Sequence, residues 1–274
     1  MILHRIISGL ILLGVILASI FIPALHWALH LLMICAALIG VYEYCFIAGQ
    51  KQEQKRLFED ILSFLFVCSL LFDAQKYSLQ HFLWIVIVFL SLTGAYYVLA
   101  RNPKESIYGT ATSLFGALWI GIPMSLGLMI LQNEKEGYLI LGCFLAIIFA
   151  TDIGGYIIGA SLGRHQLSPN LSPRKTIEGS IGGFVFAILG GLLCYEILHL
   201  LHKPLFHVGE TLILGAMSGI TSQIGDLVES AFKRDAGIKD SGKILRGHGG
   251  ILDRIDSVLF TLPLLYLYLV IFPR

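Results

Sequence analysis

The segment Leu79–Ala100, LQHFLWIVIVFLSLTGAYYVLA, contains no Asp, Glu, Lys or Arg. An α-helix needs about 20 mainly apolar residues to cross the hydrocarbon core of a bilayer, so this segment predicts a transmembrane helix. The whole chain of 274 residues has the same character, because 56% of it is hydrophobic and 14% is charged, against roughly 25% charged residues in soluble domains. This composition excludes a disordered chain, a small disulfide scaffold and an ordinary soluble enzyme.

Apolar stretches of this kind alternate with polar clusters along the chain. We therefore expect an all-α, polytopic integral membrane protein with about nine transmembrane helices. The expected spans are 6–22, 27–48, 59–73, 79–100, 107–131, 138–160, 179–202, 210–230 and 253–272. We expect the first to be an uncleaved span and not a signal peptide, because further apolar segments follow it at once.

The loops between these spans differ in positive charge. With the N-terminus inside, 15 of the 19 Lys and Arg residues fall on the inner side and four on the outer side. Lys and Arg accumulate on the cytoplasmic side of membrane proteins. We therefore expect a cytoplasmic N-terminus in a multi-pass protein of the cell membrane. The long polar connections 161–178 and 231–252 would then face the cytoplasm, and we expect any chemistry there.

Acidic residues inside apolar spans are expensive to bury, so each is a candidate functional residue. The second half of the chain contains five, namely Asp152, Asp226, Glu229, Asp253 and Asp256. Asp226 and Glu229 are three residues apart and share a helix face, as do Asp253 and Asp256. Clustered carboxylates repel one another unless a cation neutralises them, and Mg²⁺ prefers such oxygen ligands. Two other carboxylates near the ends of spans, Glu43 and Glu196, are interpreted as interfacial residues.

An alternative for the acidic cluster is neutralisation by salt bridges. The basic partners that the sequence offers are Lys233, Arg234 and Arg254. Ser222 precedes Asp226 by about one helical turn and lies on the same face, so a hydroxyl could join the carboxylates.

Basic residues and glycines accompany the carboxylates. A run of cations leads into Gly-His248-Gly249-Gly250, and Lys175 and Thr176 lie at the start of the span that follows 161–178. Cations and exposed glycine N–H groups are what a polyphosphate needs, and a helix N-terminus also attracts anions. Binding of anionic lipid headgroups alone is the alternative for the basic run.

The stretch 230–256, SAFKRDAGIKDSGKILRGHGGILDRID, closely resembles the signature of phosphatidate cytidylyltransferases, also called CDP-diacylglycerol synthases. That pattern is Ser-x-hydrophobic-Lys-Arg, four residues, Lys-Asp, a short spacer and His-Gly-Gly-x-x-Asp-Arg-x-Asp. The blocks 152–156 and 172–179 are similar to further segments of this family. Arg246 stands where the family usually has Pro or Gly, and Ile177 where Trp is common, so the local loop geometry differs from the family pattern.

The resemblance implies a reaction between CTP and phosphatidic acid that gives CDP-diacylglycerol and pyrophosphate at the cytoplasmic face of the membrane. It implies Mg²⁺ as cofactor, with room for a second divalent or monovalent cation. CTP, phosphatidic acid and membrane lipids are the expected partners, a homodimer is compatible with the family, and nucleic acid is not expected. The resemblance divides the chain into 1–150, spans for scaffold and lipid access, and 151–274, the catalytic region.

The resemblance also implies roles for individual residues. For the metal it implies Asp226 and Asp253 as leading ligands, supported by Asp256 and Ser222, with Asp152 as an auxiliary ligand. For the phosphates it implies the cations Lys175, Lys233, Arg234, Lys239 and Arg254. For the nucleotide it implies His248, Gly249, Gly250 and Thr176.

Two alternatives to this function remain at the level of sequence. A CTP-dependent transferase or kinase could act on a polyprenyl or ether-lipid acceptor, since the sequence does not fix the lipid tail. An ion-coupled transporter could also place carboxylates in interrupted helices, but it would have two similar halves. The polar motifs of this chain fall in the second half only.

Overall fold

The computed structural model describes residues 13–50, 57–100, 106–242 and 249–272. Its elements are, in order, η1 (Pro23–Leu25), α2 (His26–Gly49), α3 (Leu57–Tyr77), α4 (Phe82–Ala100), α5 (Ser106–Asn133), α6 (Gly137–Leu162), β1 (Gln166–Ser168), β2 (Ser172–Thr176), α7 (Ile177–Leu200), α8 (Val208–Asp235) and α9 (Leu252–Ile271). Residues 13–21 are helical as well. The expected all-α polytopic class is confirmed, and the only strands within the described residues form one short hairpin.

Seven helices of the described chain are long and apolar enough to cross a membrane. They correspond to seven of the nine expected spans. The expected span 59–73 is present as α3, but α3 is not among the seven because it carries Glu59, Asp60, Asp73 and Lys76. The expected span 6–22 lies partly outside the described residues. The count of nine and the cytoplasmic N-terminus therefore stay predictions.

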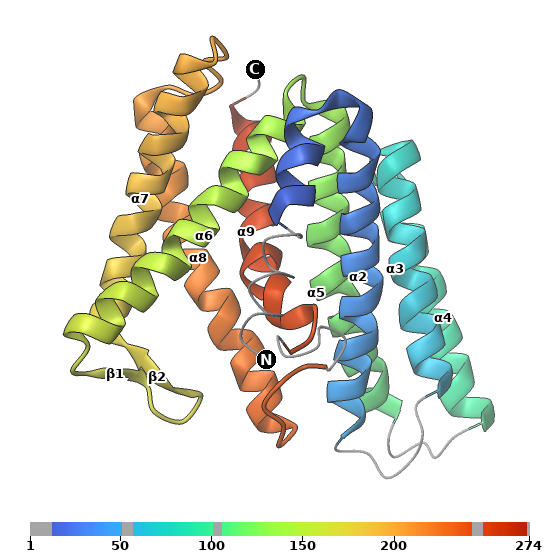
Figure 1. The fold of residues 1–274 in the computed structure, drawn as a ribbon. Helices are drawn as coiled ribbons and strands as arrows, with labels where there is room; N and C mark the ends of the chain where they lie inside the picture. Colours follow the sequence, from blue (N-terminus) through green and yellow to red (C-terminus); the bar gives the residue numbers. More distant parts are fainter. Residues whose placement is uncertain (1–12, 51–56, 101–105, 243–248, 273–274) are drawn as a thin grey trace.

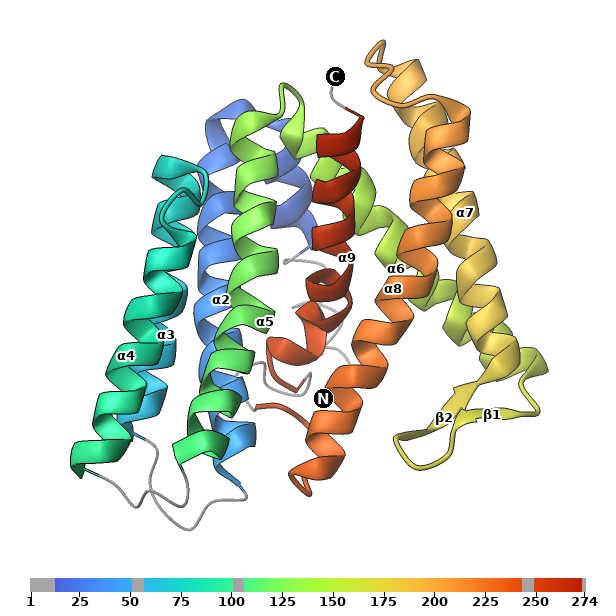
Figure 2. The same ribbon diagram turned by 180° about the vertical axis from the view of Figure 1, so that it is seen from behind.

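The helices form two groups (Figures 1 and 2). α2, α3, α4, α5 and α9 make an upright bundle, whereas α6, α7 and α8 lean away from it. α6 runs outward from the bundle to the β hairpin, and α8 returns from the far end of α7 to the beginning of α9. The most extensive contacts of the second group join α6 to α7 and α7 to α8, and α8 also packs on α9.

The connections alternate between the two ends of the molecule as the sequence predicts. The end of α2, the β hairpin and the end of α8 lie together at the lower end in Figure 1. The turns that join α3 to α4, α5 to α6 and α7 to α8 lie at the opposite end. We call the lower end the basic end, because the connections predicted there carry most of the Lys and Arg residues.

The two long polar connections are more ordered than the sequence indicated. Residues 166–176 form an antiparallel hairpin in which Gln166 pairs with Thr176. α8 continues to Asp235, so the predicted end of this span at residue 230 is wrong. The extension has a physical cause, because Lys233 forms an ion pair with Glu229 one turn earlier, and cations in a last turn interact favourably with the helix dipole.

Small residues let α6, α7 and α8 approach closely. The glycines of α6 at 155 and 159 face Gly179 of α7, and small residues at such a crossing let the two helix backbones approach closely. At the next crossing, a Cβ on Gly215 of α8 would lie 2.9 Å from the carbonyl oxygen of Ala187 in α7. That contact is with backbone, so a side chain at Gly215 would force the two helices apart.

We predict that Gly215→Ala destabilises the protein by about 1–3 kcal/mol, because an added methyl group cannot be accommodated without moving α7. Gly209→Ala is the matched control on the same helix, since a Cβ there would meet nothing within 4 Å. The control should be neutral or stabilising, because Ala favours helix over Gly by up to about 1 kcal/mol. Thermal unfolding of both variants in detergent measures the difference, and equal melting temperatures would contradict the crossing.

Candidate active site

The polar residues singled out by the sequence gather around the part of α8 that lies near the basic end. Asp226, Glu229 and Lys233 follow one another along α8. α6 and the β hairpin approach one side of this segment, and α9 packs on another side (Figures 1 and 2). Two groups of side chains result, one between α8 and the hairpin and one between α8 and the start of α9.

The first group lines a pocket of about 460 Å³ between α6, the β hairpin, α7 and α8, which we call the hairpin pocket. Asp152 of α6, Lys175 of β2 and Asp226 of α8 contribute to its walls. Lys175 and Asp226 form an ion pair, and both side chains are partly exposed. Lys175 was not among the salt-bridge partners that the sequence suggested for the acidic residues.

Gln223, which was not identified from the sequence, lines the hairpin pocket. Gln223 accepts a 2.5 Å hydrogen bond from the Ser180 hydroxyl and donates to the Ser180 carbonyl at 3.1 Å. This reciprocal pair fixes α7 against α8 beside Asp226. The position of Gln223 could have identified it from the sequence, because it is a polar residue inside an apolar span, one helical turn from Asp226. Thr176, predicted at a nucleotide site, caps α7 by accepting a hydrogen bond from Gly179 N at 3.1 Å.

Three carboxylates lie close enough to repel one another. The charge of Asp226 acts on both Asp152 and Asp256, and the charge of Asp152 acts on Asp256. Lys175 and Arg254 are the nearby cations that act on Asp152. Carboxylates of α6, α8 and α9 therefore act on one another electrostatically.

The carboxylate and hydroxyl oxygens of this cluster are of the chemical type that hard divalent cations prefer as ligands. Ser222 is 1% exposed, and its hydroxyl has no hydrogen-bond partner among the described residues. It lies one turn before Asp226 on α8, and a buried hydroxyl without a partner is costly. In the described part of the chain, however, no three His, Cys, Asp or Glu side chains form a ready metal site. The predicted Mg²⁺ site therefore stays a prediction.

The second group surrounds Asp253 at the start of α9. Lys233 Nζ lies 2.5 Å from Asp253 Oδ1 and also pairs with the fully buried Glu229. Asp253 Oδ2 accepts hydrogen bonds from Gly250 N at 2.7 Å and from Ser241 N at 3.1 Å. Asp253 and Glu229 are therefore neutralised by a salt bridge to Lys233, which was the alternative to metal binding.

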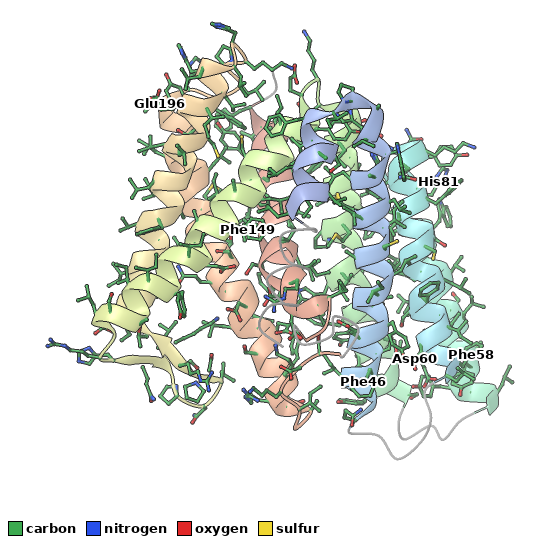
Figure 3. All side chains as sticks on the ribbon, viewed as in Figure 1. Phe46, Phe58, Asp60, His81, Phe149 and Glu196 are labelled. Carbon is green, nitrogen blue, oxygen red and sulfur yellow. The ribbon has the colours of Figure 1, made fainter. Side chains whose placement is uncertain are left out.

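Glu43 of α2 belongs to this second group, although the sequence indicated an interfacial residue. That interpretation is wrong, because Glu43 is 1% exposed. Its carboxylate accepts hydrogen bonds from Ile251 N at 3.1 Å and Leu252 N at 2.8 Å. Glu196, interpreted in the same way, is exposed near the upper end of α7 (Figure 3).

The remaining predicted residues have varied surroundings. Arg234 donates to the carbonyl oxygens of Leu171 at 3.1 Å and Ile238 at 3.2 Å, which ties the hairpin to the end of α8. Lys239 and Arg254 are exposed. Gly249 has a φ of +80°, a backbone conformation that favours glycine. His248 and Arg246 lie outside the described residues.

Comparison with known proteins shows which protein family the sequence matches. The profile of the cytidylyltransferase family matches residues 3–272. The chain is 42% identical over 177 residues to a phosphatidate cytidylyltransferase of Staphylococcus aureus (strain COL), an alignment that covers 64% of this chain and 65% of that protein. A protein of the same name from Synechocystis sp. is 39% identical over 212 residues, covering 67% of this chain and 71% of the relative. The chain thus matches just under two thirds of the length of the staphylococcal relative.

We predict that Lys233→Met destabilises the protein by about 3 kcal/mol or more, because it leaves Glu229 and Asp253 buried without their cation. Lys135→Met is the control, since Lys135 is exposed at the opposite end of the molecule. Thermal unfolding in detergent compares the two variants. Equal melting temperatures would mean that Lys233 does not neutralise the buried carboxylates.

Proposed function

The chain belongs to the cytidylyltransferase family, and from that premise we propose that it transfers the cytidylyl group of CTP to phosphatidic acid. The products are CDP-diacylglycerol and pyrophosphate. The names of its relatives from Staphylococcus aureus and Synechocystis support this substrate pair. The observation that carries the proposal is the convergence of Asp152, Lys175 and Asp226 in the walls of the hairpin pocket at the basic end.

The proposed reaction brings two anions together. An oxygen of the lipid phosphate attacks the α-phosphorus of CTP, a new P–O bond forms, and the bond from that phosphorus to the pyrophosphate oxygen breaks. The attacking oxygen is already ionised, so no strong general base is needed. The obstacle is electrostatic repulsion, which oriented cations reduce in a site of low dielectric constant.

Cationic side chains surround the proposed site. Lys175 lines the hairpin pocket and is held by Asp226, so its ammonium group is oriented toward the space where a phosphate would bind. Arg234 holds the hairpin beside α8. Arg254 and Lys239, both exposed, remain proposed partners of the phosphates. His248, Gly249 and Gly250 remain proposed neighbours of the nucleotide.

Asp226, Asp256 and Ser222 are the proposed ligands of Mg²⁺, with Asp152 as an auxiliary ligand. When bound, such an ion neutralises the reacting phosphates and stabilises the pyrophosphate leaving group. Asp253, a leading metal ligand by resemblance, accepts hydrogen bonds from Ser241 and Gly250 and pairs with Lys233. These contacts favour a role for Asp253 in holding Lys233.

The location proposed for this chemistry is the cytoplasmic side of the cell membrane. The uneven distribution of Lys and Arg supports it, since 15 of 19 belong to connections on one side. There the acyl chains of the lipid stay in the bilayer while its phosphate meets a soluble nucleotide. We propose 151–274 as the catalytic region and 1–150 as scaffold and lipid access. The homodimer and a second cation stay predictions.

We predict that the purified protein forms CDP-diacylglycerol and labelled pyrophosphate from [γ-³²P]CTP and phosphatidic acid, and that EDTA abolishes both products. Polyprenyl phosphate and ether-linked lipid phosphates serve as competing acceptors in the same assay. Faster turnover of one of these acceptors would reassign the lipid substrate. Family membership already argues against the ion-coupled transporter, and absence of pyrophosphate release with every acceptor would overturn the transfer itself.

We predict that Asp226→Asn lowers kcat by about a hundredfold or more, the usual loss for a group that stabilises transition-state charge. It should also raise the Mg²⁺ concentration needed for half-maximal rate. Asp253→Asn should lower kcat without that change in Mg²⁺ dependence, because its proposed partner is Lys233.

Glu196→Gln is the control for both variants, since it removes an exposed carboxylate near the far end of α7 (Figure 3). It should keep the activity of the wild-type protein. An unchanged Mg²⁺ dependence in Asp226→Asn would remove that residue from the proposed ligands.

A further inference from the structure

Glu43 is the one residue of α2 whose carboxylate reaches the second group of the candidate site. It is 1% exposed in a helix that is apolar enough to span the membrane. An acidic residue in such a position costs several kcal/mol unless its oxygens are satisfied. Within the described part of the chain, the Glu43 carboxylate accepts hydrogen bonds from Ser241 and Ile251, which lie between α8 and α9, and from Leu252, the first residue of α9.

We propose that Glu43 is a positioning residue, which fixes the start of α9 and so orients Asp253 and Lys233 for the proposed cytidylyl transfer. The inference rests on that proposed function for its consequence in catalysis. Its structural part, the anchoring of residues 241 and 250–253, is independent of any substrate. We call these residues the anchored loop.

The first step in the argument is the capping of α9. The N–H groups of the first helical turn have no partners within their own helix. Ile251, the N-cap residue, supplies no side-chain hydrogen bond. Glu43 provides the missing acceptors from another helix, because Ile251 N and Leu252 N both donate to its carboxylate. A negative charge at this position also interacts favourably with the helix dipole.

The second step is the connection to Asp253. Ser241 is fully buried, and its hydroxyl lies 3.0 Å from Glu43 Oε2 and 3.0 Å from Asp253 Oδ2. Ser241 therefore joins the two carboxylates, because its hydroxyl can donate to Glu43 while its backbone N–H donates to Asp253 Oδ2 at 3.1 Å. Asp253 Oδ1 in turn lies 2.5 Å from Lys233 Nζ. A continuous series of polar contacts thus runs from α2 through the anchored loop to α8.

The third step concerns the glycines of the signature. A Cβ built on Gly250 would collide with both oxygens of Glu43, and one on Gly242 would collide with Glu43 as well. The carboxylate therefore occupies the space that side chains at these positions would fill. This packing leaves the anchored loop little freedom, as a positioning role requires.

The test uses two variants of the full chain. Glu43→Gln replaces one acceptor oxygen with an NH₂ donor, and Ser241→Ala removes the hydroxyl between the carboxylates. The matched controls are Glu196→Gln and Ser69→Ala, because Glu196 is exposed and the exposed Ser69 hydroxyl bonds only to its own helix. Ser241→Ala is the smaller change, and it tests the proposal even where Glu43→Gln fails to fold.

Hydrogen–deuterium exchange without substrate reports on the anchoring. We expect the amides of residues 250–253 to exchange at least about tenfold faster in Glu43→Gln, which corresponds to one lost hydrogen bond of about 1.4 kcal/mol. Amides of α6 and α7 should keep their wild-type rates. Unchanged exchange at 250–253 would overturn the proposal.

Turnover of CTP with phosphatidic acid reports on positioning. We expect both variants to lower kcat by about 10- to 100-fold, the range for partners that orient functional groups, with KM values for both substrates within about threefold. The double variant should be no slower than the slower single variant, because both residues act through one series of contacts. A wild-type kcat in Glu43→Gln, or additive losses in the double variant, would overturn the proposal.

The two proposals fail in different ways. A wild-type protein that releases no pyrophosphate from CTP would overturn the proposed function, whereas exchange in Glu43→Gln would still decide whether Glu43 holds the anchored loop. An active wild-type protein with an equally active Glu43→Gln variant would overturn the positioning role alone.

Discussion

A carboxylate in the apolar part of a membrane protein must be compensated, and this requirement governs the arrangement around α8 and α9. Every carboxylate of the second group finds a cation or hydrogen-bond donors. Glu229 and Asp253 share Lys233, and Glu43 takes the N–H groups at the start of α9. In the other group Asp226 pairs with Lys175, but the buried Ser222 hydroxyl has no hydrogen-bond partner among the described residues. The unpartnered hydroxyl supports the proposal that a cation binds beside Asp226.

The sequence was informative where one local property decides the outcome. Long apolar runs predicted the spans, because a helix in lipid must satisfy its own backbone and cover it with apolar side chains. Spacing of three or four residues placed Ser222, Asp226 and Glu229 on one face of a helix. The signature between 230 and 256 predicted the family, which the profile match confirms. α3 was harder to predict, since it carries two buried carboxylates, Glu59 and Asp73, and Glu59 accepts a hydrogen bond from Tyr97 of the next helix.

Contacts between distant segments could not be predicted in this way. Glu43 is separated from Leu252 by about 200 residues, and no periodicity relates them. The local sequence around a buried carboxylate does not differ from that around a carboxylate at the membrane interface. The same holds for Gln223 and Ser180, whose reciprocal hydrogen bonds depend on how closely α7 and α8 approach. The extent of α8 was misjudged because basic residues suggested a loop, although they also stabilise a helix end.

The contact between α2 and the start of α9 has a consequence for modularity. The signature and most of the catalytic candidates belong to the second half of the chain. That distribution would suggest that the second half can be transferred between homologues on its own. Yet the first turn of α9 is completed by a residue from the first half. A chimera assembled from two homologues would have to inherit a compatible acid on its second helix. The halves of this protein are therefore expected to have diverged in concert.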